Sequence, residues 1–97
     1  MAILQVEVTL SDGIVRVEIY VDEQEVTFDS DNKGSVAVEG ACGDGSDHRL
    51  NYTIEGPAGE TVSVKVYCGD ATVLNLEDIK IFPEAAPLAV GWAEFKL

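Results

Sequence analysis

Basic residues are scarce in this sequence, which holds six Lys and Arg residues against 18 Asp and Glu residues, for a net charge of −12. Nucleic acids and anionic membrane surfaces attract positively charged proteins, so the composition excludes both classes of partner. Long apolar runs are absent, since none approaches the ~18 residues that a membrane-spanning helix requires. Residues 1–7 also lack the basic and apolar regions of a signal peptide, so neither membrane insertion nor a secretion signal is predicted.

Side chains suited to catalysis, carboxylates apart, are few: the chain has one histidine and two cysteines. No nucleophile motif surrounds His48, and no glycine-rich loop precedes a helix at which a phosphate could bind. Carboxylates are so numerous that spacing cannot single out a catalytic pair. The sequence therefore predicts a protein that is not an enzyme.

Alternation of apolar and polar residues dominates the 97-residue chain, of which 46% is hydrophobic. Leu4, Val6 and Val8, for example, are separated by single polar residues, a pattern typical of half-buried antiparallel strands. Turn residues separate further segments of this kind, which we predict as short strands at 4–10, 15–21, 26–28, 35–40, 48–55, 61–68, 73–76, 79–82 and 90–97. No segment sustains a helical period, although 74–78 is compatible with one helical turn.

About eight such strands predict an all-β fold for a single domain spanning 1–97, a two-sheet antiparallel β-sandwich of immunoglobulin-like size and strand pattern. An antibody-type domain would place its tryptophan between the two cysteines, whereas Trp92 follows both. We expect Trp92 in the core. The alternation also predicts that Leu10 and Val15 face the core.

The two cysteines are the first candidate site. Cys42 continues the inward parity of Val36 and Val38, and Cys68 continues that of the strand at 61–68. Shared core-facing parity predicts a disulfide between them, with two buried free thiols as the alternative. Closing the intervening loop would stabilise the fold by about 3 kcal/mol in the chain-entropy model. A disulfide would favour an oxidising, extracellular or surface location, while the lack of a signal peptide argues against secretion.

The loop that begins at Asp29 is a candidate calcium site. Asp29, Asp31 and Asn32 place oxygen atoms at closely spaced positions, as at the start of a calcium loop. The loop departs from that pattern at Lys33 and at Gly40, where an oxygen ligand and a bidentate glutamate would stand. Ordinary turn chemistry, in which such side chains bond their own backbone, is the alternative.

A second acidic set, Asp44, Asp47 and Asp70, is the other candidate for calcium. With His48 and the two cysteines, Asp44 and Asp47 could instead supply zinc ligands, but the closely spaced cysteine pairs of structural zinc sites are missing. Both metal hypotheses compete with a purely structural role for these loops.

A non-catalytic module for structural assembly or protein interaction is the function that these patterns favour. Sandwiches expose loops and edge strands, and edge pairing is a common way for them to bind or self-assemble. One alternative is a calcium-assisted carbohydrate-binding domain that uses Tyr20, Tyr67 and Trp92. A second is an acidic inhibitor or immunity-type protein, because a charge of −12 would steer a basic partner inward.

Overall fold

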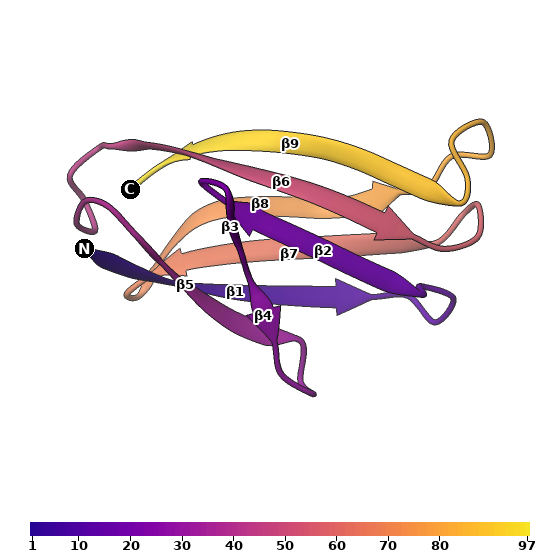
Figure 1. The fold of residues 1–97 in the computed structure, drawn as a ribbon, viewed down its shortest axis with the longest axis horizontal. Helices are drawn as coiled ribbons and strands as arrows, with labels where there is room; N and C mark the ends of the chain where they lie inside the picture. Colours follow the sequence, from indigo (N-terminus) through magenta and orange to yellow (C-terminus); the bar gives the residue numbers. More distant parts are fainter.

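The computed structural model describes every residue from Met1 to Leu97 and contains strands but no helix. The strands are β1 (Ala2–Leu10), β2 (Arg16–Val21), β3 (Gln24–Glu25), β4 (Thr27–Phe28), β5 (Lys33–Val38), β6 (Asp47–Glu55), β7 (Thr61–Cys68), β8 (Ala71–Lys80) and β9 (Leu88–Lys96). They form a five-stranded sheet in the order β4-β5-β1-β7-β8 and a four-stranded sheet in the order β3-β2-β6-β9, packed as two layers (Figure 1). The predicted antiparallel β-sandwich is confirmed, and it has nine strands.

The core lies between the two sheets and is built from the alternate residues that the sequence pattern marks as apolar. On the five-stranded sheet, β1 and β7 pair so that Val6 lies opposite Val66 and Val8 opposite Val64. The four-stranded sheet contributes fully buried side chains from β2 and β6, among them Ile19 and Leu50. Valine and isoleucine suit this half-buried, pleated surface, which explains why they dominate both inner faces.

The strand expected at 26–28 is shortened to residues 27–28, which pair with β5 in the five-stranded sheet. Residues 24–25, not expected as a strand, pair with β2 in the four-stranded sheet. Val26 lies between them, buried, and its N–H donates to the carbonyl of Ile19 at 2.9 Å. The chain therefore crosses from one layer to the other at a single buried residue.

β8 corrects a second prediction, because residues 71–80 form one strand and neither two strands nor a helical turn at 74–78. The ladder between β7 and β8 shifts register near Val62 and again near Val66. Asp78, close to one of these irregularities, has a φ of 52°. Bulges absorb the extra residues, so the strand stays paired where the alternation breaks.

Three predicted inward residues point to solvent instead. Leu10 lies at the end of β1, and Val15 precedes β2, beyond its regular pairing. Trp92 is 57% exposed, since the small odd-numbered residues of β9 take the inner face. A side-chain carbon at inward-facing Gly91 would collide with the ring of Tyr52, so this part of the interior has no room for a tryptophan. The core position expected for Trp92 is wrong.

Both termini, the β5–β6 loop and the β7–β8 turn gather at one end of the sandwich (Figure 1). Along one side of the molecule, the last strands of the two sheets, β8 and β9, contact each other without pairing into a common ladder. The candidate functional features lie at the end that carries these loops and along the side where β8 and β9 end their sheets.

Candidate functional site

The structure joins Cys42 and Cys68 as a disulfide, with Cα atoms 5.6 Å apart. The bond ties the β5–β6 loop to the end of β7. Cys68 is buried as predicted, but Cys42 is exposed, because the chain turns at Gly40, whose φ is 106°. Parity therefore predicted the pairing although it assigned Cys42 to the wrong environment.

Asp44 organises the β5–β6 loop. Its Oδ2 accepts the Ala41 N–H at 2.8 Å, and its Oδ1 accepts the N–H of Ser46 at 2.9 Å and the hydroxyl of Ser46 at 2.6 Å. These hydrogen bonds, the one from the Ser46 hydroxyl first, lower the pKa of Asp44 to about 2. The carboxylate predicted to bind calcium is thus occupied by its own loop.

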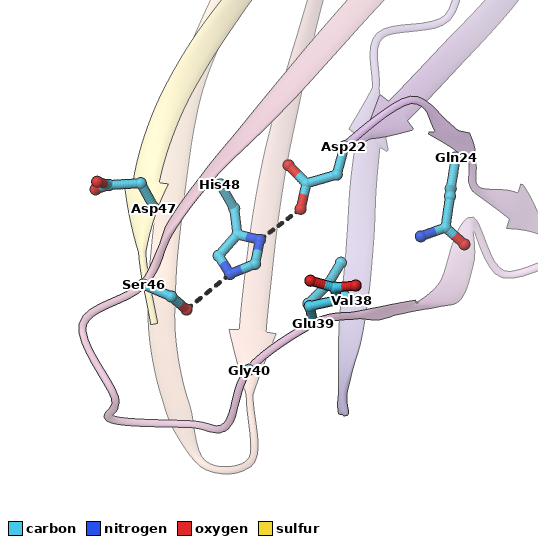
Figure 2. A pocket seen from close by; sticks show the side chains of 8 residues that line it. All are labelled: Asp22, Gln24, Val38, Glu39, Gly40, Ser46, Asp47 and His48. Carbon is cyan, nitrogen blue, oxygen red and sulfur yellow. Dashed lines mark hydrogen bonds and ion pairs between the residues drawn. The ribbon is translucent and has the colours of Figure 1, made fainter.

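His48 is a buried polar residue that connects this loop to the β2–β3 turn (Figure 2). Its Nδ1 lies 2.5 Å from Oδ2 of Asp22, and its Nε2 lies 2.9 Å from Oγ of Ser46. The second oxygen of Asp22 accepts the Arg49 N–H at 2.9 Å, and the ring of Phe95 stacks on the imidazole. We call the group of Asp22, Asp44, Ser46, His48 and the disulfide the polar end.

Sequence reasoning missed the roles of Asp22 and Ser46. Asp22 is separated from His48 by 26 residues, and no spacing rule connects two loops across a sheet. A weak signal existed in the Asp44–His48 segment, where Ser46 and His48 share strand parity and so project to one side.

The order Asp22, His48, Ser46 matches that of a catalytic triad, but the hydrogen bonds of Ser46 favour a structural role. A hydroxyl has one proton to donate, and ionised Asp44 accepts it at 2.6 Å, so Ser46 does not direct this proton to His48 as the serine of a triad would. The negative charge of Asp44 would also oppose formation of an alkoxide at Ser46. The N–H groups of Gly45 and Ser46, which could otherwise stabilise an oxyanion, are bonded to Leu97 O and to Asp44.

A hollow of about 560 Å³ lies beside this network, and Figure 2 shows the residues that line it. The lining is mostly polar, with Val38 as its one apolar residue. Glu39 and Asp47 also line it, but the imidazole of His48 is hydrogen-bonded to Asp22 and Ser46, and Asp47 is paired with Lys96. The hollow therefore lacks the apolar walls that usually hold a small organic ligand.

The candidate calcium residues are not brought together. Oδ1 of Asp29 accepts the N–H groups of Asp31 and Lys33 at 2.9 and 3.0 Å, the turn chemistry named above as the alternative. No group of three or more His, Cys, Asp or Glu side chains in the structure is arranged to hold a metal ion. This geometry gives the calcium and zinc interpretations no support at either Asp29 or Asp44.

β9 forms the second notable region, since it is the last strand of the four-stranded sheet and pairs only with β6. At its two ends, Leu97 N–H donates to the carbonyl of Ser46, and Gly56 N–H donates to that of Pro87. Odd-numbered residues therefore direct their backbone groups toward β6, because hydrogen-bonding direction alternates along an antiparallel strand. Even-numbered residues direct theirs to the open side.

The same even-numbered residues place their side chains on the outer face of the sheet. We call this row the β9 edge; it consists of Leu88, Val90, Trp92, Glu94 and Lys96. Leu88, Val90 and Trp92 are 40%, 72% and 57% exposed. Apart from a bond between Leu88 N–H and Ala85 O, their backbone groups have no partner in the chain. Free hydrogen-bonding groups and exposed apolar side chains thus coincide.

Charges on the outer face behind this row are largely compensated. Arg16 bonds Glu18 and lies 3.3 Å from Glu55, while Lys96 pairs with Asp47. The guanidinium of Arg49 lies 4.0 Å from the ring centroid of Trp92, in a cation–π contact. Trp92 is therefore held on the surface by a neighbour on β6 rather than by burial.

The other three sheet edges are shorter or irregular. β3 and β4 contain two residues each, and they leave Arg16–Ile19 of β2 and Val36–Val38 of β5 without a strand on that side. β8 is bulged in two places and carries Asp78 in a left-handed conformation. Short edges and bulges are the usual devices that prevent unwanted pairing. β9 has nine residues, no register shift and an apolar centre, so it alone is long, regular and unprotected.

The structure contains no helix long and apolar enough to cross a membrane. No protein-family model, curated protein or solved structure matches this chain.

Proposed function

We propose that this protein is a non-catalytic docking module that binds another protein by accepting one of its segments as an additional strand at the β9 edge. The observation that carries this proposal is the coincidence, on one long regular strand, of unpaired backbone groups with the exposed side chains of Leu88, Val90 and Trp92. In strand addition, main-chain hydrogen bonds supply affinity and alternate side chains supply specificity.

Pairing of the β9 edge with a partner strand is expected to be more favourable in free energy than its exposure to solvent. Each added backbone hydrogen bond contributes about 0.5–1.5 kcal/mol net, so several of them, with burial of Val90 and Trp92, would offset the ordering of a short segment. The acceptor strand is rigidly mounted, because β6 pairs with it along its whole length and Phe95 is anchored on His48. A preformed edge lowers the entropy cost of binding.

Blocking the edge tests the proposal. Val90→Pro removes an outward N–H and obstructs pairing while keeping an apolar, uncharged side chain, and proline is tolerated at strand edges. Val90→Thr keeps the N–H and is the matched control. Affinity capture from the producing organism, read by quantitative mass spectrometry, should recover a protein with wild type and Val90→Thr that is lost with Val90→Pro. Identical recoveries with all three baits would contradict the proposal.

Carbohydrate binding is a second candidate, favoured by one observation. Tyr20 and Trp92 both lie opposite Asn51 across adjacent strands, which places two aromatic rings and an amide in one row on the outer face. Trp92 is the only tryptophan, so its fluorescence reports on this row directly. A change in that fluorescence on addition of an oligosaccharide mixture, absent in Tyr20→Ala, would favour sugar binding over strand addition.

A further inference from the structure

We infer that the segment that adds to the β9 edge is an extended, positively charged stretch of a different protein. This inference rests on the function proposed above and specifies the chemistry of the partner. The alternative occupants are a neutral or acidic segment and a second copy of this chain. The charges and contacts around β9 distinguish among them.

Carboxylates outnumber basic side chains on β8, on β9 and in the connection between these strands. Glu84 in the connection and Glu77 and Asp78 on β8 are exposed and form no ion pair. Glu94 on β9 lies opposite Arg49 of β6 and two positions from Lys96. Lys80 is the one basic residue of β8. A strand laid along β9 therefore enters a negative field, which favours basic side chains and disfavours acidic ones.

Electrostatic repulsion disfavours a second copy of this chain as the occupant of the β9 edge. Pairing β9 with β9 of another molecule would bring together two bodies that each carry a net charge of −12. It would also duplicate the excess of carboxylates on β8, on β9 and in the connection between them. Self-association is therefore opposed both by the overall charge and by the local arrangement.

Trp92 adds a specific recognition element. Arg49 reaches its ring from β6, with 4.0 Å between the guanidinium and the ring centroid. Strands on either side of β9 stand at the same spacing from it, about 4.8 Å. Arg49 lies opposite Glu94 and reaches the ring of Trp92 diagonally. A lysine or arginine beside Glu94 on the added strand can therefore reach the ring by the same diagonal geometry. The position beside Val90 suits an apolar or β-branched residue.

Selection from a displayed library of random peptides of strand length tests both the partner chemistry and the proposed function. Wild-type protein and Val90→Pro serve as baits, and Val90→Thr is the control. Lys96→Pro, which blocks the edge nearer the strand end, provides a second blocked bait, and a thermal melt confirms that each variant is folded. Binding of enriched peptides is then measured through Trp92 fluorescence, and sedimentation equilibrium measures self-association.

The expected result is enrichment of peptides in which Lys or Arg alternates with β-branched residues, retained by Val90→Thr and lost by the blocked variants. Replacing their basic residues by Gln should weaken binding on the order of tenfold, since two or three exposed charge contacts are lost. Enrichment of neutral or acidic peptides that still depends on an open edge would overturn the basic partner and leave the docking function standing. An edge-dependent dimer would do the same, with a second copy as occupant. Absence of any edge-dependent binding would overturn the docking function itself.

Discussion

The polar end and the β9 edge differ in how their polar groups are satisfied, although β9 contacts the polar end through Phe95, which stacks on His48. At the polar end, Asp44, Ser46 and His48 bond one another, and no buried side-chain nitrogen or oxygen in the protein lacks a partner. At the β9 edge, a row of backbone groups has no partner and apolar side chains lie exposed. On β9, the side chains of odd-numbered residues such as Phe95 point into the interior, while those of even-numbered residues such as Trp92 point to solvent.

This difference separates stabilising structure from a binding surface. A polar network that is fully satisfied within the chain has little left to offer a ligand, even when its order resembles a catalytic triad. An edge strand that retains free donors, acceptors and apolar side chains can gain free energy from a partner. If the comparison holds, changes at the polar end will lower stability, whereas changes at the β9 edge will alter binding with little effect on stability.

Loss of the disulfide should have the largest effect. The double variant Cys42→Ala/Cys68→Ala releases the constraint on a loop with a sequence separation of 26, which is expected to lower the free energy of unfolding by about 3 kcal/mol. Chemical denaturation measures it, and reduction of the wild-type protein is the independent control. Two alkyl adducts on denatured, unreduced wild-type protein would show that the cysteines are free and contradict the bond.

Truncation of His48 should cost less but still more than truncation of an aromatic residue at the edge. His48→Ala leaves Asp22 and Ser46 without their buried partner, which is expected to lower the unfolding free energy by about 1–3 kcal/mol. Trp92→Ala, the matched ring truncation, loses mainly the contact with Arg49 and should cost no more than about 1 kcal/mol. Denaturant titrations of both variants give the comparison, and equal losses would erase the distinction between the two regions.

The pH dependence of Asp44 provides a smaller effect. Its pKa is lowered from 3.8 to about 2 by hydrogen bonds in the folded loop. A lowered pKa adds stability that is present above the unfolded value and lost as pH falls from about 3.8 toward 2. The difference in melting temperature between wild type and Asp44→Asn should therefore shrink across that interval. Asp31→Asn, in a loop carboxylate whose oxygens accept no hydrogen bond, is the control, and a constant difference for Asp44→Asn would contradict the assignment.

Much of the fold was predictable because period-two alternation reports which face of a strand is buried. It succeeded for Val6, Val64 and Val66, which fill the space between the sheets. It failed for Trp92, because parity says which residues share a face and not which face is inward. On β9, the ring of Tyr52 determines which residues point inward, because it leaves room only for glycine at position 91.

The candidate site was harder to predict, since it depends on contacts between distant segments. The disulfide was predicted from the shared parity of the two cysteines in the chain. The joining of Asp22 to His48 did not, because it arises from the packing of the β2–β3 turn against the start of β6. The β9 edge could not be predicted either, because sequence alternation does not show which strand lies at the edge of a sheet. The crossing at Val26 and the bulges of β8, which shorten or interrupt the other edges, are likewise properties of the assembled sandwich.

Amide hydrogen exchange sharpens the comparison within β9 itself, with no expected change in overall stability. The N–H groups of Val90, Trp92 and Glu94 face the open side, so they should exchange at nearly the rate of an unfolded chain, with opening free energies near ~0. Those of Gly91 and Ala93 bond β6 and should exchange only on global unfolding, which costs about 5 kcal/mol or more. Exchange followed by NMR should therefore alternate along the strand. Uniform protection would mean that the edge is already covered, by a second copy or by another part of the chain, and would remove the basis for docking. Selective slowing at the even-numbered positions on addition of a bound basic peptide would place the new strand on the β9 edge.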